Sequence, residues 1–362
     1  MLGWDVASWE MGKNEMPIRN KRAPTLADVA REARVSLKTA SRVLNGASNV
    51  RQEKVSKVQA VMARLGYRPN ELARSLMTRK SGTIGIIVAN LANPFVIEVI
   101  KAVQQVARAN GYVLIITSSE GQPEVESAEI ESLVRRRIDG LIIAPASSGP
   151  RLSSHLLPAN IPTVTFDQLV RGTDFDSVII TNRQSASEAT KHMIAHGYRR
   201  IVAVGTRPYL YTSKERVAGY RRSMAQSGLE ARECFVKHES LLTAKWLEEE
   251  MFRGETAEAI FSLNWVTTQH VLRGLRDLGI SAGRDIALIS FDDFDLGEML
   301  TPGLSVVQQP SDSLGRESAR LLFERLKGDH ALPSRRIVLQ ARLVIRQSCG
   351  CGVGGSLVAG PP

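Results

Sequence analysis

The N-terminal part of the chain carries apolar residues at helical spacing in three short runs. The first run follows Thr25, a helix-capping residue type, and Asp28 three positions later completes a variant of the capping box. The second run follows Ser36, another capping residue. The third covers residues 51–65 and stops at Gly66, a residue type that adopts the left-handed turn ending many helices. The pattern predicts a tight unit of three short helices.

Beyond this unit the pattern changes to short continuous apolar runs that alternate with amphipathic ones. Such an alternation is typical of a doubly wound sheet of buried parallel strands. Strands are expected at 83–88, 112–117, 140–145, 163–166, 177–181, 200–204, 234–237, 259–262 and 286–291. Helices are expected at 94–109, 123–137, 184–196, 214–228, 245–253 and 267–278. Because the strand–helix cycle repeats from residue 177, the sequence predicts two similar lobes with a cleft between them.

The charge of the chain is concentrated at its N-terminal end. Residues 1–81 hold 16 basic and 7 acidic residues, a net charge of +9, whereas residues 82–362 hold 31 and 30, a net charge of +1. A basic head on a neutral body is typical of a protein that binds nucleic acid. The alternative is a disordered basic arm, and the helical periodicity of the head argues against it.

Length and composition bound the class of protein. The 362 residues suit two or three domains, and 43% of them are hydrophobic, enough for a proper core. No apolar run approaches the ~18 residues of a membrane helix, and the first residues lack the apolar stretch of a signal peptide. We therefore expect a cytoplasmic protein without membrane contact.

The second predicted helix has the features of a DNA-recognition helix. It is short, follows a tight turn and presents Lys38, Thr39, Ser41 and Arg42 outward. The N-terminal residues of such a helix reach base edges in the major groove, and its hydroxyls and cations hold phosphates. The alternative at this point is a generic helical bundle with a solvated face.

The segment TLADVAREARVSLKTASRVLNGASNVRQEKVSKVQAVMARLGYRPNELARSL closely resembles the DNA-binding head of the LacI/GalR family of bacterial repressors. Nearly every position of the family pattern T-x-x-D-V-A-x-x-A-x-V-S-x-x-T-V-S-R-V-L-N is matched, as is its ending G-Y-x-P-N-x-x-A-R-S-L. One departure is Ala40, where the family usually has valine. The resemblance implies base readout by Leu37 and Lys38, with Arg42 one turn later; lysine and arginine donate to guanine, and leucine can touch a thymine methyl group. The full set of expected DNA contacts is Thr25, Ser36, Leu37, Lys38, Thr39, Ser41, Arg42, Asn45, Tyr67, Asn70, Arg74, Ser75 and Leu76.

A short segment after the head resembles the family's hinge helix. Asn70 can cap a helix over Glu71–Met77 that is too short to be stable alone in water. The resemblance implies that this helix folds on DNA, paired with its copy from a second subunit. Leu76 matches the leucine that inserts into the minor groove and kinks the DNA, and Arg74 is expected to contact phosphate. Without the resemblance, Leu76 would be interpreted as an ordinary linker residue.

Polar and aromatic side chains follow several predicted strands of the body, where open α/β sheets bind ligands. The resemblance places Arg216, Asn264 and Asp292 in contact with an effector and extends the set to Asp167 and Phe95. Two carboxylates, an amide and a guanidinium beside an aromatic ring suit a polyhydroxylated ligand, since each hydroxyl both donates and accepts.

Alternatives remain for several of these residues. Each carboxylate can instead cap a helix, and Trp265 can stack on a sugar or simply pack. Thr181-Asn182 stands where the family usually has Asp-Asn, which leaves the ligand open between a sugar, the default, and a nucleobase-type effector.

Signs of an enzyme or a metal protein are sparse. The body has no nucleophile elbow, P-loop or zincin motif, so we expect neither catalysis nor a cofactor. His192 and His196 stand four apart on a predicted helix, and the favoured interpretation is a surface pair near the helix end. Cys349 and Cys351 fall in a Gly-rich tail, where an unstructured segment is favoured over a metal site. No metal is therefore expected.

The expected architecture is a multidomain α+β chain in which a lambda-repressor-like helix-turn-helix precedes a two-lobed α/β domain like that of periplasmic binding proteins. Its parts are a disordered extension (1–23), the helix-turn-helix head (24–70), a hinge helix and linker (71–81), the effector-binding and dimerisation domain (82–348) and a flexible tail (349–362). Gln309-Pro310 matches the crossing back to the first lobe, where the helix over 314–327 belongs. The expected partners are pseudo-palindromic double-stranded operator DNA, a small-molecule effector and a second copy of the chain.

Overall fold

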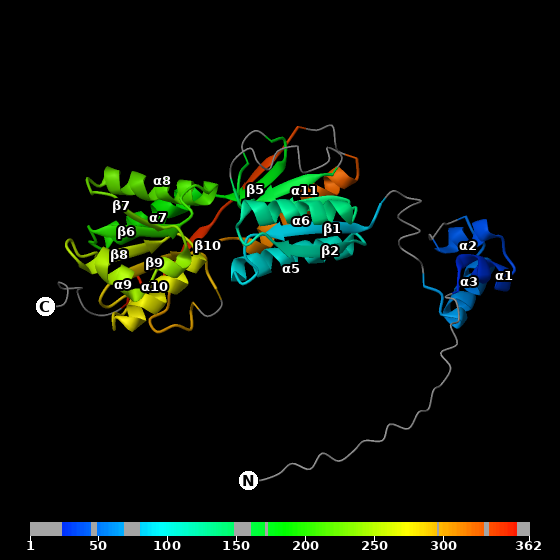
Figure 1. The fold of residues 1–362 in the computed structure, drawn as a ribbon, viewed down its shortest axis with the longest axis horizontal. Helices are drawn as coiled ribbons and strands as arrows, with labels where there is room; N and C mark the ends of the chain where they lie inside the picture. Colours follow the sequence, from blue (N-terminus) through cyan, green and yellow to red (C-terminus); the bar gives the residue numbers. More distant parts are fainter. Residues whose placement is uncertain are drawn as a thin grey trace, which may run out of the picture. The chain divides into compact units, whose positions relative to one another are not determined.

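The structure is a computed structural model that describes residues 24–44, 49–68, 80–147, 161–170, 173–294, 297–328 and 333–352. The chain divides into two units, residues 1–79 and 80–362, which we call the head and the body (Figure 1). No helix of the described residues is long and apolar enough to cross a membrane.

The head contains the three predicted helices, α1 (Leu26–Glu32), α2 (Leu37–Leu44) and α3 (Gln52–Leu65). The capping box is formed: the Asp28 amide donates to Thr25 Oγ1 (3.3 Å), and the Thr25 amide donates to the Asp28 carboxylate (2.9 Å). Gly66 ends α3 in the left-handed conformation, as predicted. The apolar periodicity makes one core from all three helices, built on Val29, Ala33, Val43, Val58 and Val61.

The body contains two six-stranded sheets, each of which forms the centre of one lobe. The sheet of the first lobe has the order β11-β5-β4-β3-β1-β2, and that of the second lobe β12-β10-β9-β8-β6-β7. The first sheet consists of β1 (Thr83–Val88), β2 (Val113–Ser118), β3 (Gly140–Ile143), β4 (Thr163–Phe166), β5 (Asp176–Ile180) and β11 (Arg336–Leu339). The second sheet consists of β6 (Ile201–Thr206), β7 (Arg232–Val236), β8 (Ala259–Ser262), β9 (Ala287–Phe291), β10 (Ser305–Gln308) and β12 (Arg342–Val344).

Helices cover the faces of both sheets (Figure 1). The first lobe has α5 (Pro94–Ala109), α6 (Pro123–Arg135) and α11 (Ser311–Leu326). The second lobe has α7 (Asn182–Ala195), α8 (Tyr211–Gln226), η2 (Glu239–Leu241), α9 (Ala244–Leu247), the π-helical η3 (Glu248–Phe252) and α10 (Trp265–Asp277). This cover buries both faces of the central strands, which is why their sequences are continuously apolar.

The strand expected at 177–181 belongs to the first sheet, which corrects the prediction that it starts the second one. In the structure β5 pairs with β4 on one side and β11 on the other, all in parallel. The apolar run identifies a strand, but its pairing partner β11 lies more than 150 residues further along the chain. Local periodicity cannot show such a partner, so the position of the boundary between the lobes was wrong.

The chain crosses between the lobes three times, after β5, after β10 and after β11. The second crossing runs through Gln309-Pro310, and the following helix α11 packs on α5 and on the first sheet, as predicted. Three crossings bring strand ends from both sheets to one place, and they leave a junction at which the lobes can move relative to each other.

The segment after β12 differs from the expected flexible tail. Cys349 is fully buried, and its carbonyl accepts a hydrogen bond from the Tyr198 hydroxyl (3.2 Å). The Leu288 amide, in β9, donates to the carbonyl of Ser348 (2.7 Å). The chain is therefore held against the second lobe as far as Cys351, whose thiol contacts α7.

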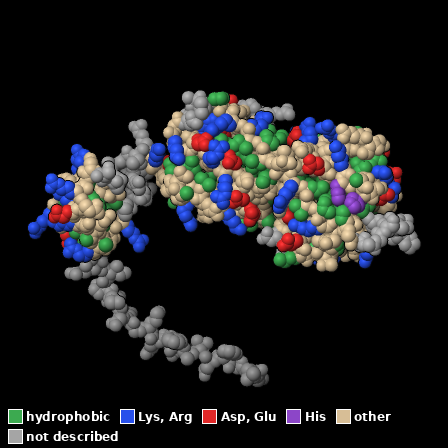
Figure 2. All heavy atoms as spheres, turned by 180° about the vertical axis from the view of Figure 1, so that it is seen from behind, with side chains coloured by type: hydrophobic (Ala, Val, Ile, Leu, Met, Phe, Trp, Pro, Cys, Tyr) green, Lys and Arg blue, Asp and Glu red, His purple; other side chains and the backbone are tan. Residues whose placement is uncertain are grey.

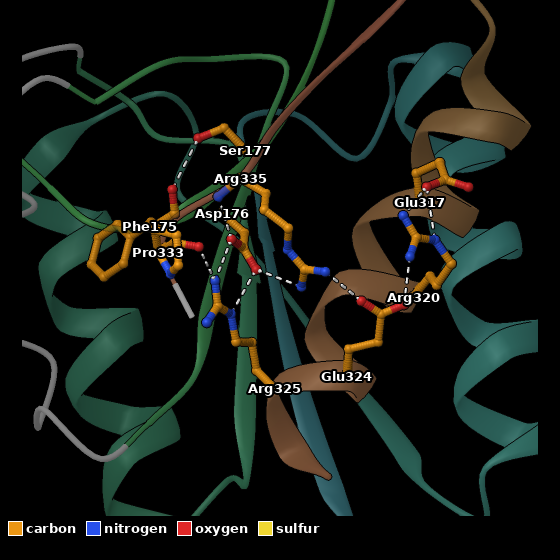
Figure 3. Close-up of polar contacts among 9 residues, drawn as sticks. All are labelled: Phe175, Asp176, Ser177, Glu317, Arg320, Glu324, Arg325, Pro333 and Arg335. Carbon is orange, nitrogen blue, oxygen red and sulfur yellow. Dashed lines mark hydrogen bonds and ion pairs between the residues drawn. The ribbon is translucent and has the colours of Figure 1, made fainter. Parts of the chain in front are cut away.

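A buried carboxylate at the start of β5 connects this strand to α11 and to the residue that precedes β11, the edge strand (Figure 3). Asp176, with 1% of its side chain exposed, accepts from Arg325 Nη2 (2.8 Å) and Nε (2.9 Å), and from the Arg335 amide (2.7 Å). Burial alone would raise the pKa of Asp176, but the hydrogen bonds from Arg325 and Arg335 outweigh it and lower this pKa. The carboxylate therefore connects the end of α11 to the start of β11.

We expect Asp176→Asn to lower the free energy of unfolding at neutral pH by about 3–5 kcal/mol, because it removes the buried carboxylate that pairs with the Arg325 guanidinium. Because the pKa of Asp176 is lowered in the folded state, its contribution is present above the pKa of an unfolded aspartate, about 3.9, and is lost as the pH falls through the folded value. Urea unfolding of both proteins at several pH values measures the effect.

Asp312→Asn is the matched control. Asp312 pairs with Arg316 (2.7 Å) on the surface of α11, the helix that also carries Arg325. An exposed pair of this kind contributes less than about 1 kcal/mol. Equal losses in the two variants would contradict the structural role of Asp176.

Candidate functional site

Helix α2 turns one face to the core of the head and the other to solvent. Ala40 and Val43 are buried, while Lys38 and Arg42 are exposed. Leu37, at the first position of the helix, is 54% exposed. The predicted base-reading side chains thus share the free surface at the start of α2, where a recognition helix meets base edges.

Other predicted DNA contacts have structural tasks as well. Ser36 caps α2, accepting from the Thr39 amide (3.1 Å), and its hydroxyl lies 2.9 Å from that of Thr39. Thr25 caps α1, and Tyr67 is half-buried against the core of the head. Ser41 is partly exposed on α2. Asn45, Asn70, Arg74, Ser75 and Leu76 lie outside the described residues, as does the predicted hinge helix.

The surface of the head is basic. On the face drawn in Figure 2, blue Lys and Arg side chains dominate over red acidic ones around the head. Within the described residues, exposed cations stand on each helix, with Arg31 on α1, Lys38 and Arg42 on α2, and Lys54 and Lys57 on α3. Such a surface attracts a phosphate backbone and supplies the part of DNA affinity that falls with salt.

A cavity of about 800 Å³ lies in the body where the carboxyl ends of strands from both lobes meet. Its walls come from the segments after β1, β2, β3 and β4 in the first lobe, and from those after β6, β7, β8, β9 and β10 together with the start of α8 in the second. All five predicted effector residues line it: Phe95, Asp167, Arg216, Asn264 and Asp292. The structure therefore brings together residues that are separated by up to 197 positions in the sequence.

Arg216 is the buried cation of this cavity and is only 4% exposed. Its Nε donates to Asn182 Oδ1 (2.8 Å), its Nη1 donates to the Leu263 carbonyl (2.6 Å), and its guanidinium carbon lies 3.6 Å from the centre of the Phe291 ring. Burial lowers the pKa of Arg216, whereas the charges of Asp292 and Asp167 raise it. Its Nη2 has no hydrogen-bond partner among the described residues, so one edge of the fork is available to a ligand.

Asp292, at the end of β9, connects three segments at the back of the cavity. One carboxylate oxygen accepts from the amide of Trp265, the first residue of α10 (3.1 Å), and the other from the side-chain amide of Gln309. The sequence analysis gave helix capping as an alternative role for this carboxylate. Asp292 does accept from the first amide of a helix, but that helix is α10, which precedes β9 in the chain. Gln309 lies on a crossing between the lobes, so Asp292 couples the cavity to that crossing.

Asp167 carries a buried carboxylate in the cavity that is only partly paired. Its Oδ2 accepts from Gln168 Nε2 (3.2 Å), but its buried Oδ1 has no partner among the described residues. Burial raises the pKa of Asp167 to about 6, against the opposing charge of Arg216 and with help from that of Asp292. Both aspartates have left-handed backbones, with φ of 62° and 81°, a conformation that is strained and is found often at ligand sites.

Asn264 has a capping role that the sequence analysis gave to the carboxylates. Its Oδ1 accepts from the Thr267 amide (2.9 Å) at the start of α10, and its Nδ2 donates to Thr206 Oγ1 (3.3 Å). Trp265 beside it is 8% exposed and lines the cavity, and its buried indole N–H has no partner among the described residues. Both residues thus belong to the wall of the cavity.

Sequence reasoning missed the side chains that connect the lobes across the cavity. Gln168, after β4, donates to Thr212 Oγ1 on α8 (2.9 Å), and Arg207, after β6, donates to the carbonyl of Glu120 (3.3 Å). All four residues follow a strand or begin a helix, so their location at the ends of these elements could be predicted from the sequence. Polar residues are ordinary in such loops, however, and nothing in the sequence marked these pairs as partners.

A basic trihelical head with an exposed second helix, followed by a two-lobed body around a polar cavity, defines a ligand-responsive DNA-binding regulator. Residues 25–70 match the family of bacterial regulatory proteins, lacI family, and residues 190–349 match a periplasmic binding protein-like domain. Catabolite control protein A of Priestia megaterium is 31% identical over 332 residues, which are 90% of this chain and 98% of that protein. The chain belongs to the LacI family of bacterial DNA-binding transcriptional regulators, as the sequence predicted.

Solved structures agree with this fold. The lac repressor dimer bound to operator and the anti-inducer ONPF matches with a TM-score of 0.77 and 24% identity, over 91% of this chain and 99% of that one. The transcriptional regulator CelR in complex with cellobiose matches with a TM-score of 0.64 and 25% identity, over 90% and 99%. The predicted fold class, a helix-turn-helix head and a two-lobed α/β body, is confirmed.

We expect Asp167→Asn to stabilise the ligand-free protein, and to do so more at high pH. An unfolded aspartate has a pKa of about 3.9, so a folded-state pKa of about 6 means that Asp167 favours folding below pH 4 and that this contribution is lost as the pH rises through 6. Asparagine resembles the protonated carboxyl at every pH. The gain in unfolding free energy over wild type should therefore grow by about 2–3 kcal/mol from pH 4 to pH 8, as urea unfolding measures.

The matched control is Asp174→Asn, because Asp174 is exposed and close in sequence. Its effect on the unfolding free energy should stay within about 0.5 kcal/mol. A gain at Asp167 that does not change with pH would show that this carboxylate does not carry a raised pKa.

Proposed function

We propose that this regulator is a repressor whose operator binding is controlled by a sugar or sugar derivative held in the cavity between the two lobes of its body. Because its target is DNA, the proposal places it in the bacterial cytoplasm, and it gives the cavity a sensing role without catalysis. It acts as a homodimer in this proposal, since one head reads only half of a pseudo-palindromic operator.

The observation that carries the proposal is the set of polar atoms in the cavity wall that lack partners. Asp167 Oδ1 and Gln309 Oε1 are acceptors without donors among the described residues, and the indole N–H of Trp265 is a donor without an acceptor. A buried polar group left unpaired is destabilising by about 1–3 kcal/mol, so a ligand that pairs with these atoms gains that energy back. Acceptors and donors together, beside the free edge of Arg216, suit a ligand with several hydroxyl groups.

The aromatic side chains of the cavity support the same class of ligand. Phe95 and Trp265 both line it, and such rings pack against the apolar face of a sugar. CelR, a similar regulator, has been solved with cellobiose. A nucleobase-type effector would also stack on these rings, but it offers fewer hydroxyl groups to Asp167 and Gln309.

For DNA readout we propose Leu37 and Lys38, with Arg42 one turn later on α2. Lysine and arginine donate to guanine O6 and N7, and the exposed leucine contacts a thymine methyl group. Thr25, Ser36, Thr39, Ser41 and Tyr67 would position the backbone or contact phosphates, together with Asn45, Asn70, Arg74, Ser75 and Leu76.

The cavity would control DNA binding through the geometry of the lobes. A ligand that contacts Asp167 from the first lobe and Arg216 from the second favours the arrangement in which both contacts form. The hydrogen bonds Gln168–Thr212 and Arg207–Glu120 cross the same gap, so they form or break with the same motion. The ligand shifts the equilibrium only by its different affinities for the two arrangements.

We expect Lys38→Ala to weaken binding to the operator of this protein, a DNA site identified by in vitro selection, by about 1–3 kcal/mol, because a base contact is lost. Binding to scrambled DNA of equal length should change much less. Fluorescence anisotropy at one fixed salt concentration measures both, with an operator obtained by in vitro selection on the wild-type chain.

Lys101→Ala is the control, since Lys101 is an exposed lysine of the body. It should leave both affinities unchanged. If Lys38→Ala weakens both DNAs equally, Lys38 contacts phosphate only and the readout assignment is wrong.

The effector is tested by thermal unfolding of the full chain with a panel of sugars, sugar acids and purines. We expect a sugar to raise the Tm, since a ligand at one hundred times its Kd stabilises the folded state by about 2.7 kcal/mol. The same sugar should raise the Tm of Asp167→Asn much less, because the substitution removes an acceptor for its hydroxyl groups. A response to purines alone would overturn the sugar class, and no response to either would contradict an effector in this cavity.

A further inference from the structure

Two histidines and two cysteines meet on the second lobe, at the end of α7 opposite to the cavity. His192 lies in the last turn of α7 and His196 caps it, while Cys349 and Cys351 follow β12. His192 Nε2 lies 3.4 Å from Cys349 Sγ and 3.6 Å from Cys351 Sγ, and Cys351 Sγ lies 3.1 Å from His196 Nε2. The ligand atoms of His192, Cys349 and Cys351 all lie within 4.8 Å of one another.

Two backbone elements position this cluster, helix α7 and the turn that contains the two cysteines. A spacing of four residues puts both imidazoles on one face of α7, where their ring centres are 4.6 Å apart. The sequence Cys-Gly-Cys-Gly forms a turn in which both glycines have positive φ (90° and 73°). In that turn the Gly350 amide donates to the Gln347 carbonyl (2.9 Å), and the two thiols face the helix. Positions 350 and 352 are thus ones that glycine suits and other residues strain.

The ligand atoms of His192, Cys349 and Cys351 are close enough to share one tetrahedral metal ion, and His196 joins this set through its contact with Cys351 Sγ. Zinc binds cysteine sulfur at about 2.3 Å and histidine nitrogen at about 2.0 Å, so a sulfur and a nitrogen that share a tetrahedral ion lie roughly 3.5 Å apart. Three of the four sulfur–nitrogen pairs lie at 3.1, 3.4 and 3.6 Å, distances that bracket this value. Two thiolates and two imidazoles are the donor set of structural zinc sites, and soft sulfur ligands disfavour magnesium and calcium.

We propose that His192, His196, Cys349 and Cys351 bind one divalent zinc-class ion in a closed tetrahedral site that fastens the C-terminal segment to α7. All four ligands come from the protein, so no coordination position is left for a substrate, and the role is structural.

The site would brace the helix that positions the buried cation of the cavity. Asn182, the first residue of α7, holds Arg216 Nε, whereas the metal ligands lie at the last residues of the helix. A helix of 14 residues is about 21 Å long, so the ion lies outside the cavity and acts on it only by fixing α7. The proposal therefore stands independently of which effector the cavity binds.

The test begins with the metal content of the full chain, purified without a metal-affinity tag and measured by mass spectrometry. We expect one equivalent of zinc per chain after growth with zinc. Cobalt(II) added to the metal-free protein should give the visible bands of a tetrahedral ion and the charge-transfer band of cobalt–thiolate bonds, saturating at one equivalent.

The double variant Cys351→Ser/His196→Gln removes two ligands that are at least partly exposed, so the fold should survive, which circular dichroism checks. It should lose the stoichiometric zinc and both cobalt signatures, and its Tm should no longer rise when zinc is added. The control Cys234→Ser/His270→Gln removes one thiol and one imidazole elsewhere in the second lobe and should keep one equivalent.

Two results would overturn the proposal. One is a wild-type chain that binds no stoichiometric zinc and gives no cobalt–thiolate band when its thiols are reduced. The other is a double variant that folds and retains the metal and its spectrum as fully as the control does. In either case the sulfur–nitrogen contacts are hydrogen bonds between thiols and imidazoles.

Discussion

The burial of the Arg216 guanidinium at the junction of the two lobes is the constraint on which the functional part of this structure depends. An arginine does not lose its charge in a protein, so the surroundings must compensate it wherever it is buried. Here the compensation comes from Asn182, from the Leu263 carbonyl, from the face of Phe291 and from the charges of Asp167 and Asp292. These groups come from both lobes. The compensation of the Arg216 charge therefore depends on how the two lobes are arranged.

Asp167 and Asp292 divide the task unequally. Both oxygens of Asp292 are used within the protein, by the start of α10 and by Gln309 on the crossing between the lobes. Asp167 keeps one buried oxygen free and has its pKa raised to about 6, mainly by burial. Asp292 therefore connects the segments at the junction, whereas Asp167 leaves one buried acceptor without a partner among the described residues. A site that stores an unsatisfied group in this way is more stable when it is filled.

Much of this molecule could be predicted from sequence because the determining signals are local. The helices of the head follow from caps and periodicity, and all five predicted cavity residues lie together because the carboxyl ends of parallel strands meet at one edge. The sheet to which β5 belongs could not be predicted from the sequence. Its partner β11 follows β5 only after five strands of the second sheet, β6 to β10, have intervened along the chain. The capping role of Asn264 was missed because amides and carboxylates cap equally well.

The histidine–cysteine cluster is a second feature that local sequence patterns could not predict. His192 and His196 were interpreted as a surface pair, and Cys349 and Cys351 as part of an unstructured tail, because each pair alone is an incomplete ligand set. Only the return of the chain to α7 after β12 brings three of their sulfur–nitrogen pairs to 3.1–3.6 Å. Long-range contacts of this kind depend on the tertiary fold and leave no period in the sequence.

The most direct test of the account is the operator affinity of the full chain with its cavity empty and with its cavity saturated by the sugar that raises the Tm. The account predicts that the Kd for operator changes by about 5–150-fold, and that operator changes the Kd for the sugar by the same factor, because coupling between two binding sites is reciprocal. Equal operator affinities with the cavity empty and filled would contradict it, since the cavity would then bind a ligand without controlling the DNA-binding head.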